Sequence, residues 1–403
     1  MTIVGILGAG QLGTMLADAI HALGAETRFY DPEASAPAIR RFVGGMSGPW
    51  TDLAHLRAFA APCDVLTYEM EHIDTDGLRS LDIDVVPSLD VLETTQDRLR
   101  EKRFLRSAGL PHVAFMEATS PADLVTRGRE FGFPLIVKTA RGGYDGKGQW
   151  RARNEDQLDL VAQQLEQDLG PRFACAMEAV VDLEREVSCI VARAHDRSVQ
   201  VFPVFENAHE HHILDWTLVP ARISPAVARR VQAIARTTAE ALGVVGLLTT
   251  EFFLSRTPAR GSESEPVDGI HVYVNELAPR PHNSGHVTRR ATSLSQFDAL
   301  ARIVLGAPVP EPTLRGNGYY CMGNLLGDVF AGQTELDLGG LACHEELLEI
   351  MLYGKLEWAP RRKMGHVIAN ACDADRALAA MRAIRGSLTL TPERPSEPPP
   401  TQR

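Results

Sequence analysis

The sequence predicts a protein of mixed α/β and α+β class that begins with a doubly wound parallel domain. Over the first ~90 residues, short apolar strands alternate with helical stretches, a pattern typical of parallel β-α-β units. From Glu186 onward, segments rich in Val, Ile and Phe predict antiparallel strands around a long helix at 225–243. At 403 residues, the chain is long enough for about two to three domains.

The composition of the chain argues against several classes of protein. Lys and Arg number 41 against 52 Asp and Glu, for a formal net charge of −11 and no long basic run, which argues against a nucleic-acid surface. The six cysteines are scattered without C-x-x-C pairs, so neither a zinc cluster nor a disulfide framework is indicated. The most apolar later run, 241–254, is short and contains Glu251. We expect a cytoplasmic protein that does not enter a membrane.

Composition shifts predict the domain boundaries. We expect a parallel domain at 1–95, a central domain at 96–305 with a small lid subdomain at about 115–182, a small β-rich C-terminal domain at 306–388, and a disordered tail at 389–403, where proline and polar residues dominate. The polar segment 257–269 reads as a hairpin insertion at the surface.

The first glycine-rich turn has the spacing of a dinucleotide-binding fingerprint. An apolar strand runs into Gly8, Gly10 and Gly13 in G-x-G-x-x-G spacing, and a second strand ends at Asp31, near the place of the acidic ribose ligand of an NAD site. This stretch alone favours an NAD-dependent oxidoreductase. That alternative leaves the clusters described next unexplained.

A second glycine-rich segment follows a strand that ends at Lys138. Four glycines lie within the seven residues 142–148, together with Lys147. Such backbone lets N–H groups approach phosphate oxygens closely, and the lysines supply opposite charge. The segment predicts a lid over phosphates, although it lacks the G-K-[ST] ending of a P-loop. The alternative is a mobile surface hairpin with solvated lysines.

Two acidic residues on predicted strands form a candidate metal site. Glu251 lies in TTEFF, and Glu276 lies beside Asn275 in VNELAP. On neighbouring strands, two carboxylates and an amide oxygen would suit Mg²⁺ that bridges nucleotide phosphates. The alternative for either glutamate is a solvent-facing position on a strand.

The run PRPHNSGH follows directly and carries Arg280, His282 and Asn283. An arginine, an imidazole and an amide beside a metal could hold a small anion and its developing charge. The alternative is a polar turn with Asn283 or Ser284 as the cap of the next helix.

A basic group near the C-terminus comprises Lys355 and the run 361–363. These cations would suit a phosphomonoester, and the alternative is a solvated charged face.

Taken in order, the motifs resemble the ATP-grasp superfamily, and within it the family of 5-(carboxyamino)imidazole ribonucleotide synthases of purine biosynthesis. The motifs are GAGQLG, TYEMEHI, QDRLREK, KTARGGYDGKGQW, NELAPRPHNSGH and RKMGH, which extend from Gly8 to His366. The resemblance implies an ATP-grasp fold with a Rossmann-like N-terminal domain and a small C-terminal domain, and it places ATP between the lid and the antiparallel sheet.

The resemblance also implies site residues. The ATP contacts would be Arg98, Lys138, Gly143, Tyr144, Asp145, Gly146, Lys147, Gly148, Gln149, Glu178, Ala179, Val180, Val181, Glu186, His209, Asn275 and Glu276. Substrate contacts would be Gln11, Leu12, Glu69, Tyr144, Asp145, Lys147, Lys355, Arg362 and Lys363. Metal ligands would be Glu251 and Glu276, and catalytic roles would fall on Lys138, Asp145, Lys147, Arg280, His282 and Asn283. His209, His211 and His212 lie in a segment richer in histidine than the family pattern, so their roles stay open.

The implied reaction is ATP- and bicarbonate-dependent carboxylation of the 5-amino group of 5-aminoimidazole ribonucleotide. Bicarbonate would attack the γ-phosphate of ATP to give carboxyphosphate, and Mg²⁺, or Mn²⁺ in its place, would neutralise charge. The family implies a homodimer. The alternative within the fold is another ATP-grasp ligase or transformylase acting on a purine-pathway ribonucleotide.

Overall fold

The computed structural model describes residues 1–143, 147–329 and 336–390. The predicted site residues Tyr144, Asp145 and Gly146, and most of the predicted disordered tail, lie outside the described residues. Thr389–Leu390 forms a short strand, β19, that pairs with β16 (Leu336–Asp337). The folded part therefore extends two residues beyond the boundary that the composition suggests.

The N-terminal unit is a parallel four-stranded sheet with the order β3-β2-β1-β4. Its strands are β1 (Ile3–Leu7), β2 (Glu26–Asp31), β3 (Gly45–Ser47) and β4 (Val65–Tyr68). Its helices are α1 (Gln11–Ala22), α2 (Pro37–Arg41), α3 (Leu53–Ala60), α4 (Thr75–Arg79) and α5 (Leu89–Thr95). Val85 and Leu66 form one isolated parallel bridge at the edge of this sheet in the described structure, and Pro87 lacks the N–H that a longer ladder would need.

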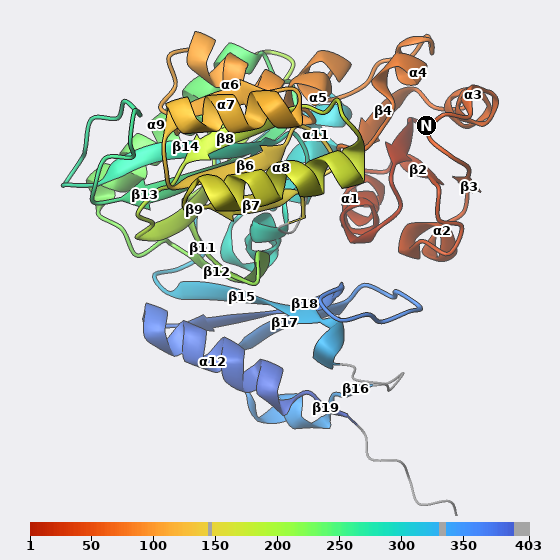
Figure 1. Ribbon diagram of the computed structural model, residues 1–403. Helices are drawn as coiled ribbons and strands as arrows, with labels where there is room; N and C mark the ends of the chain where they lie inside the picture. Colours follow the sequence, from red (N-terminus) through yellow and green to blue (C-terminus); the bar gives the residue numbers. More distant parts are fainter. Residues whose placement is uncertain (144–146, 330–335, 391–403) are drawn as a thin grey trace, which may run out of the picture.

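The lid is a four-stranded antiparallel sheet with the order β5-β8-β6-β7. Its strands are β5 (Phe115–Ala118), β6 (Leu135–Thr139), β7 (Gln149–Ala152) and β8 (Cys175–Ala179), and its helices are α7 (Pro121–Phe131) and α8 (Glu155–Leu169). The two helices lie side by side over the sheet (Figure 1). Ser120 and Asn154 cap them by accepting hydrogen bonds from backbone N–H groups. The glycine-rich segment follows β6 in the chain, as the sequence predicts, and precedes β7, which the sequence analysis did not identify.

A nine-stranded sheet forms the centre of the molecule. Its order is β14-β13-β9-β11-β12-β15-β18-β17, and β10 pairs with β9. Its strands are β9 (Arg185–Arg193), β10 (Val199–Val201), β11 (Phe205–Glu210), β12 (Ile213–Val219), β13 (Gly246–Ser255), β14 (His271–Ala278), β15 (Tyr319–Leu326), β17 (Leu347–Leu352) and β18 (Lys363–Ala371). Every pairing in it is antiparallel. The sequence analysis did not identify β12 and β17. Strands β10 and β11 lie on either side of Pro203, which cannot donate to a ladder.

Helices cover this sheet and complete the C-terminal part. They are α6 (Arg98–Ser107), α9 (Pro225–Leu242), α10 (Thr288–Ala291), α11 (Gln296–Val304) and α12 (Ala374–Ser387), with short 3₁₀ turns η1 (Asn283–Val287), η2 (Gly327–Val329) and η3 (Gly339–Cys343). The C-terminal strands β15, β17 and β18 extend the central sheet, and α12 packs across them below the rest of the molecule (Figure 1). The C-terminal part therefore shares its hydrogen-bonded sheet with the central domain.

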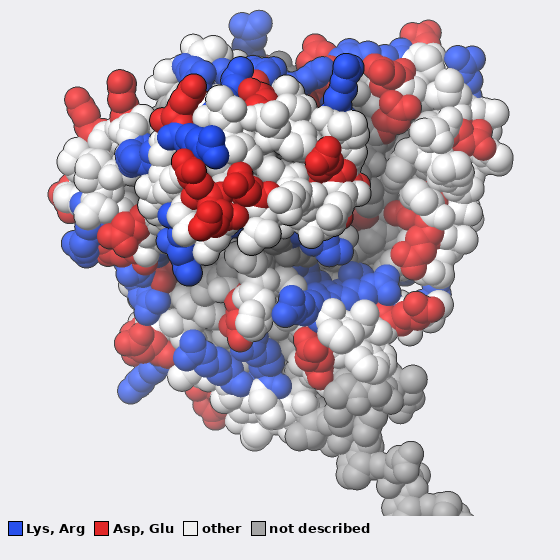
Figure 2. Space-filling view, viewed as in Figure 1, with Lys and Arg blue, Asp and Glu red and all other residues white. Residues whose placement is uncertain are grey.

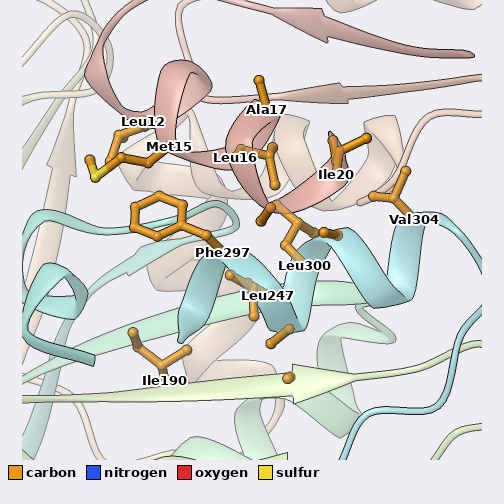
Figure 3. Close-up of a cluster of buried hydrophobic side chains, with 14 of the residues drawn as sticks. Leu12, Met15, Leu16, Ala17, Ile20, Ile190, Leu247, Phe297, Leu300 and Val304 are labelled. Atoms are coloured by element: carbon orange, nitrogen blue, oxygen red, sulfur yellow. The ribbon is translucent and has the colours of Figure 1, made fainter. Parts of the chain in front are cut away.

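The N-terminal unit is fixed to the centre by packing of α1 on α11. Figure 3 shows Leu16 and Ile20 of α1 facing Leu300 and Val304 of α11, with Leu247 of the sheet beneath. Each of these side chains is buried, and burial of one such side chain stabilises the fold by about 1.5–3 kcal/mol. This packing holds the glycine-rich turn before α1 in a fixed position relative to the central sheet.

The segment 257–269 lies against the lid. Val267 and Ile270 form an isolated bridge, and Arg260 donates to the carbonyl oxygens of Gly132 (2.9 Å) and Pro134 (3.3 Å). These carbonyls follow the C-terminal end of α7, where a cation is favourable. The insertion thus contacts the base of the lid.

None of the described helices has both the length and the apolar character needed to cross a membrane.

Candidate active site

One cavity of about 580 Å³ brings the predicted clusters together. It is lined from the N-terminal turn, the lid, the central sheet and the C-terminal strands. In Figure 2 this face is hollowed between the lid and the C-terminal strands, and Lys and Arg side chains border its lower edge. The predicted site residues in its lining are Gln11, Leu12, Glu69, Arg98, Lys138, Gly143, Lys147, Gly148, Gln149, Glu186, His209, Glu251, Asn275, Glu276, Arg280, His282, Asn283, Lys355, Arg362 and Lys363.

The segment 178–181 lies outside that lining. Ala179 is buried at the end of β8, Val180 and Val181 follow it half-buried, and Glu178 is 2% exposed. The resemblance implies a backbone contact to adenine from this segment, and the structure shows in addition a side-chain role for Glu178, namely an ion pair with Lys138.

The two predicted metal ligands are cross-strand neighbours. Glu251 of β13 lies opposite Glu276 of β14, and the register shifts by one residue at this point, so Asn275 is the extra residue of a β-bulge. The described residues contain no group of three or more His, Cys, Asp or Glu that could enclose a metal ion. Two carboxylates and an amide oxygen nevertheless fit Mg²⁺, which is often held by one or two carboxylates together with substrate phosphates.

Glu251 is ionised in this setting. His282 Nε2 lies 3.1 Å from its Oε1. Burial opposes ionisation, but the hydrogen bond and charge of His282, followed by the charges of His209 and Arg280, lower the pKa of Glu251 to about 2. These surroundings favour the charged carboxylate, which is the form that a hard cation prefers.

Lys138 is buried and held by acidic and amide oxygens. Its Nζ donates to Glu178 Oε2 at 2.6 Å and to Asn275 Oδ1 at 3.4 Å. Lys102 Nζ lies 3.4 Å from the other oxygen of Glu178. Burial lowers the pKa of Lys138, and the charge of Glu178 acts against that shift. The ammonium group is thereby held at Asn275, which precedes the predicted metal ligand Glu276 in the chain.

The PRPHNSGH segment is built on a rigid turn. Gln296 accepts a hydrogen bond from the His282 N–H and donates to the His282 carbonyl, both at 2.8 Å. Arg280 Nε lies 2.7 Å from Glu71 Oε1. Both polar atoms of the Asn283 side chain are buried without a hydrogen-bond partner among the described residues. Such orphaned groups are rare in native structures and indicate a missing ligand or water.

The sequence analysis considered Asn283 or Ser284 as a helix cap in this segment. In the structure, His282 occupies the cap position of η1, and its ring nitrogen accepts from the Ser284 N–H at 3.4 Å. Glu71 and Gln296 were missed as supporting residues. Glu71 lies within the motif TYEMEHI, whereas Gln296 is identified only by the folded structure.

The glycine-rich turn before α1 binds a carboxylate of the protein itself. Glu69 accepts hydrogen bonds from the backbone N–H groups of Gly10 and Gly13, and burial raises its pKa to about 6. Asp31 Oδ2 accepts the Ala9 N–H at 2.8 Å. The N–H groups and the acidic residue that an NAD site would use are therefore already engaged, which removes the basis of the oxidoreductase alternative.

The basic residues of the C-terminal part line the same cavity, namely Lys355, Arg362 and Lys363. Lys355 Nζ donates to the Lys363 carbonyl at 2.7 Å, and Arg362 NH2 lies 3.8 Å from Glu33 of the N-terminal unit. Burial, followed by the charge of Arg362, lowers the pKa of Lys355 to about 8. Glu33 and Asp31 line the cavity as well.

The histidine-rich segment forms the β11–β12 hairpin. His209 Nδ1 lies 2.6 Å from Glu186 Oε2. Burial lowers the pKa of His209, but the hydrogen bond and charge of Glu186 and the charge of Glu251 together outweigh burial and raise the pKa. His211 and His212 form a two-residue turn with φ of 49° and 67°, and His212 contacts Gln149 of the lid at 3.0 Å. The hairpin thus reaches the edge of the lid.

Family models match three consecutive parts of the chain. A ribonucleotide synthetase preATP-grasp domain matches residues 1–96, an ATP-grasp domain matches 103–297, and a phosphoribosylaminoimidazole carboxylase C-terminal domain matches 321–380. The N5-carboxyaminoimidazole ribonucleotide synthase of Bacillus subtilis (strain 168) is 35% identical over 370 residues, which cover 91% of this chain and 90% of the relative.

This chain belongs to the N5-carboxyaminoimidazole ribonucleotide synthase family. A solved ADP complex of an N5-carboxyaminoimidazole ribonucleotide synthetase superposes with a TM-score of 0.85 at 34% identity, and covers 95% of this chain and 96% of the other. An Aspergillus clavatus enzyme solved with ADP and 5-aminoimidazole ribonucleotide gives a TM-score of 0.81 at 28% identity, with coverages of 96% and 98%.

These findings confirm the fold class and the family resemblance seen in the sequence. The protein is an ATP-grasp ligase of purine biosynthesis that makes N5-carboxyaminoimidazole ribonucleotide. Membership in this family also decides against the other ATP-grasp ligases and transformylases.

Proposed function

We propose that the 580 Å³ cavity binds ATP beneath the lid and 5-aminoimidazole ribonucleotide between the N-terminal turn and the C-terminal strands. ATP phosphorylates bicarbonate, and the carboxyl group then passes to the 5-amino group of the ribonucleotide. The products are N5-carboxyaminoimidazole ribonucleotide, ADP and phosphate. The observation that carries this assignment is that a single cavity contains the lid lysines, the carboxylate pair, the PRPHNSGH residues and the basic C-terminal group.

The phosphates of ATP lie at the end of the cavity that carries Glu251 and Glu276, the two proposed metal ligands. Glu251, Glu276 and the amide of Asn275 would hold Mg²⁺, or Mn²⁺ in its place, and a bound ion would supply charge neutralisation at the ATP phosphates. Lys138 and Lys147 add positive charge from the lid side. Gly143, Gly148 and Gln149 frame the loop that closes over the phosphates, and Arg98, Glu178–Val181, Glu186, His209 and the loop residues 144–146 complete the proposed ATP site.

Phosphoryl transfer to bicarbonate needs positioning and charge neutralisation rather than a covalent enzyme group. Arg280, His282 and Asn283 surround the small anion beside the metal pair. The unpartnered amide of Asn283 supplies one donor and one acceptor for it. Carboxyphosphate formed there hydrolyses readily, and closure of the lid excludes water.

The ribonucleotide lies at the opposite end of the cavity. Lys355, Arg362 and Lys363 bind its 5′-phosphate, and Gln11, Leu12 and Glu69 contact it from the N-terminal turn. The side chain of Leu12 packs into the α1–α11 core (Figure 3), so its contact uses backbone atoms. Tyr144 and Asp145 approach from the lid in this proposal, with Asp145 orienting or deprotonating the amine.

The similar enzymes support these ligands. Solved relatives carry ADP, ATP, or ADP together with 5-aminoimidazole ribonucleotide. A homodimer in the cytoplasm is the assembly that the family implies.

The test is ADP release by the purified protein with MgATP, bicarbonate and each candidate acceptor in turn. We expect release that depends on 5-aminoimidazole ribonucleotide and on bicarbonate. Equal ADP release with formate and glycinamide ribonucleotide, or no dependence on the acceptor, would overturn the proposed reaction.

A further inference from the structure

We infer that Glu101 and Lys102 are positioning residues that hold Glu276 in its metal-binding position, an inference that rests on the proposed function of Glu276. Both lie in the motif QDRLREK, in which only Arg98 is assigned a role above. Neither residue lines the main cavity. Their side chains hydrogen-bond to the backbone on either side of Glu276.

Strand β14 is the edge strand of the nine-stranded sheet, and it carries the bulge at Asn275. Its pairing with β13 passes from Val274–Phe252 to Glu276–Glu251 and leaves Asn275 without a cross-strand partner. A bulge redirects side chains and disrupts the ladder locally. The backbone around Glu276 therefore needs support from outside the sheet.

Helix α6 supplies this support along its buried face. Lys102 Nζ donates to the carbonyl oxygen of Asn275 at 3.0 Å, and Glu101 Oε2 accepts the Leu277 N–H at 2.8 Å. Residues 275 and 277 are the two neighbours of Glu276 in the chain. One helix thus fixes both the preceding carbonyl and the following N–H of the proposed metal ligand.

The spacing along α6 brings a third side chain to the same place. Arg98, Glu101 and Lys102 are at positions i, i+3 and i+4, which share one helix face. Arg98 NH2 lies 3.6 Å from Glu276 Oε2. The helix therefore contacts Glu276 through its carboxylate and through the peptide groups before and after it.

The burial of two long ionisable side chains here indicates more than a strand edge that is merely covered. Glu101 is 1% exposed and Lys102 is 0% exposed. Burial of a polar group is costly unless it is hydrogen-bonded, and apolar side chains would cover a strand edge without that cost. Both polar ends instead meet a peptide group of β14 beside the bulge.

Lys102 also connects the metal pair to the lid. It lies 3.4 Å from Glu178, which binds Lys138, and Lys138 in turn contacts the Asn275 side chain. The network begins and ends at Asn275. The metal-binding bulge and the phosphate-binding lysine are consequently positioned by the same buried residues.

Substitution of Glu101 or Lys102 should weaken metal binding. The loss of affinity should exceed what the accompanying decrease in protein stability accounts for. Outer residues that support metal ligands typically change metal affinity by about 10–100-fold when mutated. Glu101→Asp keeps the carboxyl group but shortens the side chain by one methylene, so the carboxyl oxygen no longer reaches the Leu277 N–H. Lys102→Met removes the donor at similar length. Glu101→Gln retains an acceptor oxygen at full length.

The experiment measures Mn²⁺ binding by electron paramagnetic resonance in the presence of ADP, alongside the urea midpoint of each variant. We expect the Mn²⁺ dissociation constant to rise about tenfold in Glu101→Asp and Lys102→Met and to stay within about twofold of wild type in Glu101→Gln. Leu105→Ala is the matched control, because Leu105 is fully buried on the same helix but packs into an apolar cluster. It should lower the urea midpoint and leave the Mn²⁺ affinity unchanged.

Wild-type Mn²⁺ affinity in folded Glu101→Asp would overturn the inference, as would an equal loss in Leu105→Ala. Glu101→Asp decides the question if Lys102→Met does not fold. Failure of the proposed function has a different signature, namely a wild-type protein that binds no Mn²⁺ with ADP or releases no ADP in response to 5-aminoimidazole ribonucleotide.

Discussion

The carboxylate of Glu69 accepts a hydrogen bond from the backbone N–H of Gly10 at the beginning of α1. A sequence fingerprint associated with dinucleotide phosphates is thus used to hold an acidic side chain. The helix N-terminus stabilises that charge, and the carboxylate becomes a fixed acceptor on the wall of the cavity. The glycines are needed because a side chain there would meet Glu69.

Gly10→Ala tests the role of this turn. An ideal Cβ at residue 10 would lie 2.8 Å from Glu69 Oε1, so the carboxylate must move. We expect the KM for 5-aminoimidazole ribonucleotide to rise by about tenfold, corresponding to about 1.4 kcal/mol, with the KM for ATP unchanged. Gly386→Ala, which has no atom near its Cβ, should leave both constants as they are. Unchanged kinetics in Gly10→Ala would remove Glu69 from the substrate site.

Glu276→Gln tests the assignment of Glu276 as a metal ligand. The side chain is 49% exposed and lies 3.6 Å from its ion-pair partner Arg98, so its loss should change the free energy of unfolding by less than about 0.5 kcal/mol. Loss of a ligand charge should reduce ADP release by about a hundredfold or more. Glu265→Gln, at an exposed position of the insertion, is the control. Normal turnover in Glu276→Gln would show that the metal assignment is wrong.

Lys355 predicts a pH dependence of substrate binding. Its pKa is lowered to about 8 by burial and then by the charge of Arg362, with Lys363 acting in the same direction and Glu69 and Glu33 against it. Only the protonated ammonium attracts a phosphate, so affinity falls as the pH rises through the pKa. Between about pH 7 and pH 9, the apparent KM for the ribonucleotide should rise by up to about tenfold.

Lys355→Arg provides the control for this titration. Arginine stays charged throughout the range, so the KM should become nearly independent of pH, even if its absolute value changes. An identical pH profile in wild type and Lys355→Arg would assign the titration to another group.

Leu300→Ala tests the packing of α11 on α1. Leu300 is fully buried beneath α1 (Figure 3), and truncation of such a residue costs about 2–5 kcal/mol. We expect a lower urea midpoint, measured by circular dichroism. Leu160→Ala, at a position 64% exposed on the lid, should have little effect. Equal stability of the two variants would mean that the two units pack more loosely than the structure shows.

The sequence predicts local features of this protein well and long-range features poorly. It identifies Glu251 and Glu276 as residues of neighbouring strands, since both lie in apolar runs with the strand pattern. It does not reveal the bulge at Asn275, because register depends on the partner strand. It assigns Gly10 and Gly13 to a phosphate or ligand turn, whereas Glu69 is 56 residues from Gly13 in the chain. It misses β17 because alternation in LLEIML is weak, and only pairing with β18 makes this segment a strand.

With the proposed metal and phosphate sites, the continuity of the central sheet has a consequence for the length of acceptor that fits. The carboxylate pair lies on β13 and β14 at one edge, and Lys363 lies on β18 near the other. Hydrogen-bonded strands, rather than a flexible linker, set the span between the proposed metal site and the proposed phosphate site. An acceptor must therefore reach from one to the other, and a free base or nucleoside that lacks the 5′-phosphate would present its amine without an anchor at the correct separation.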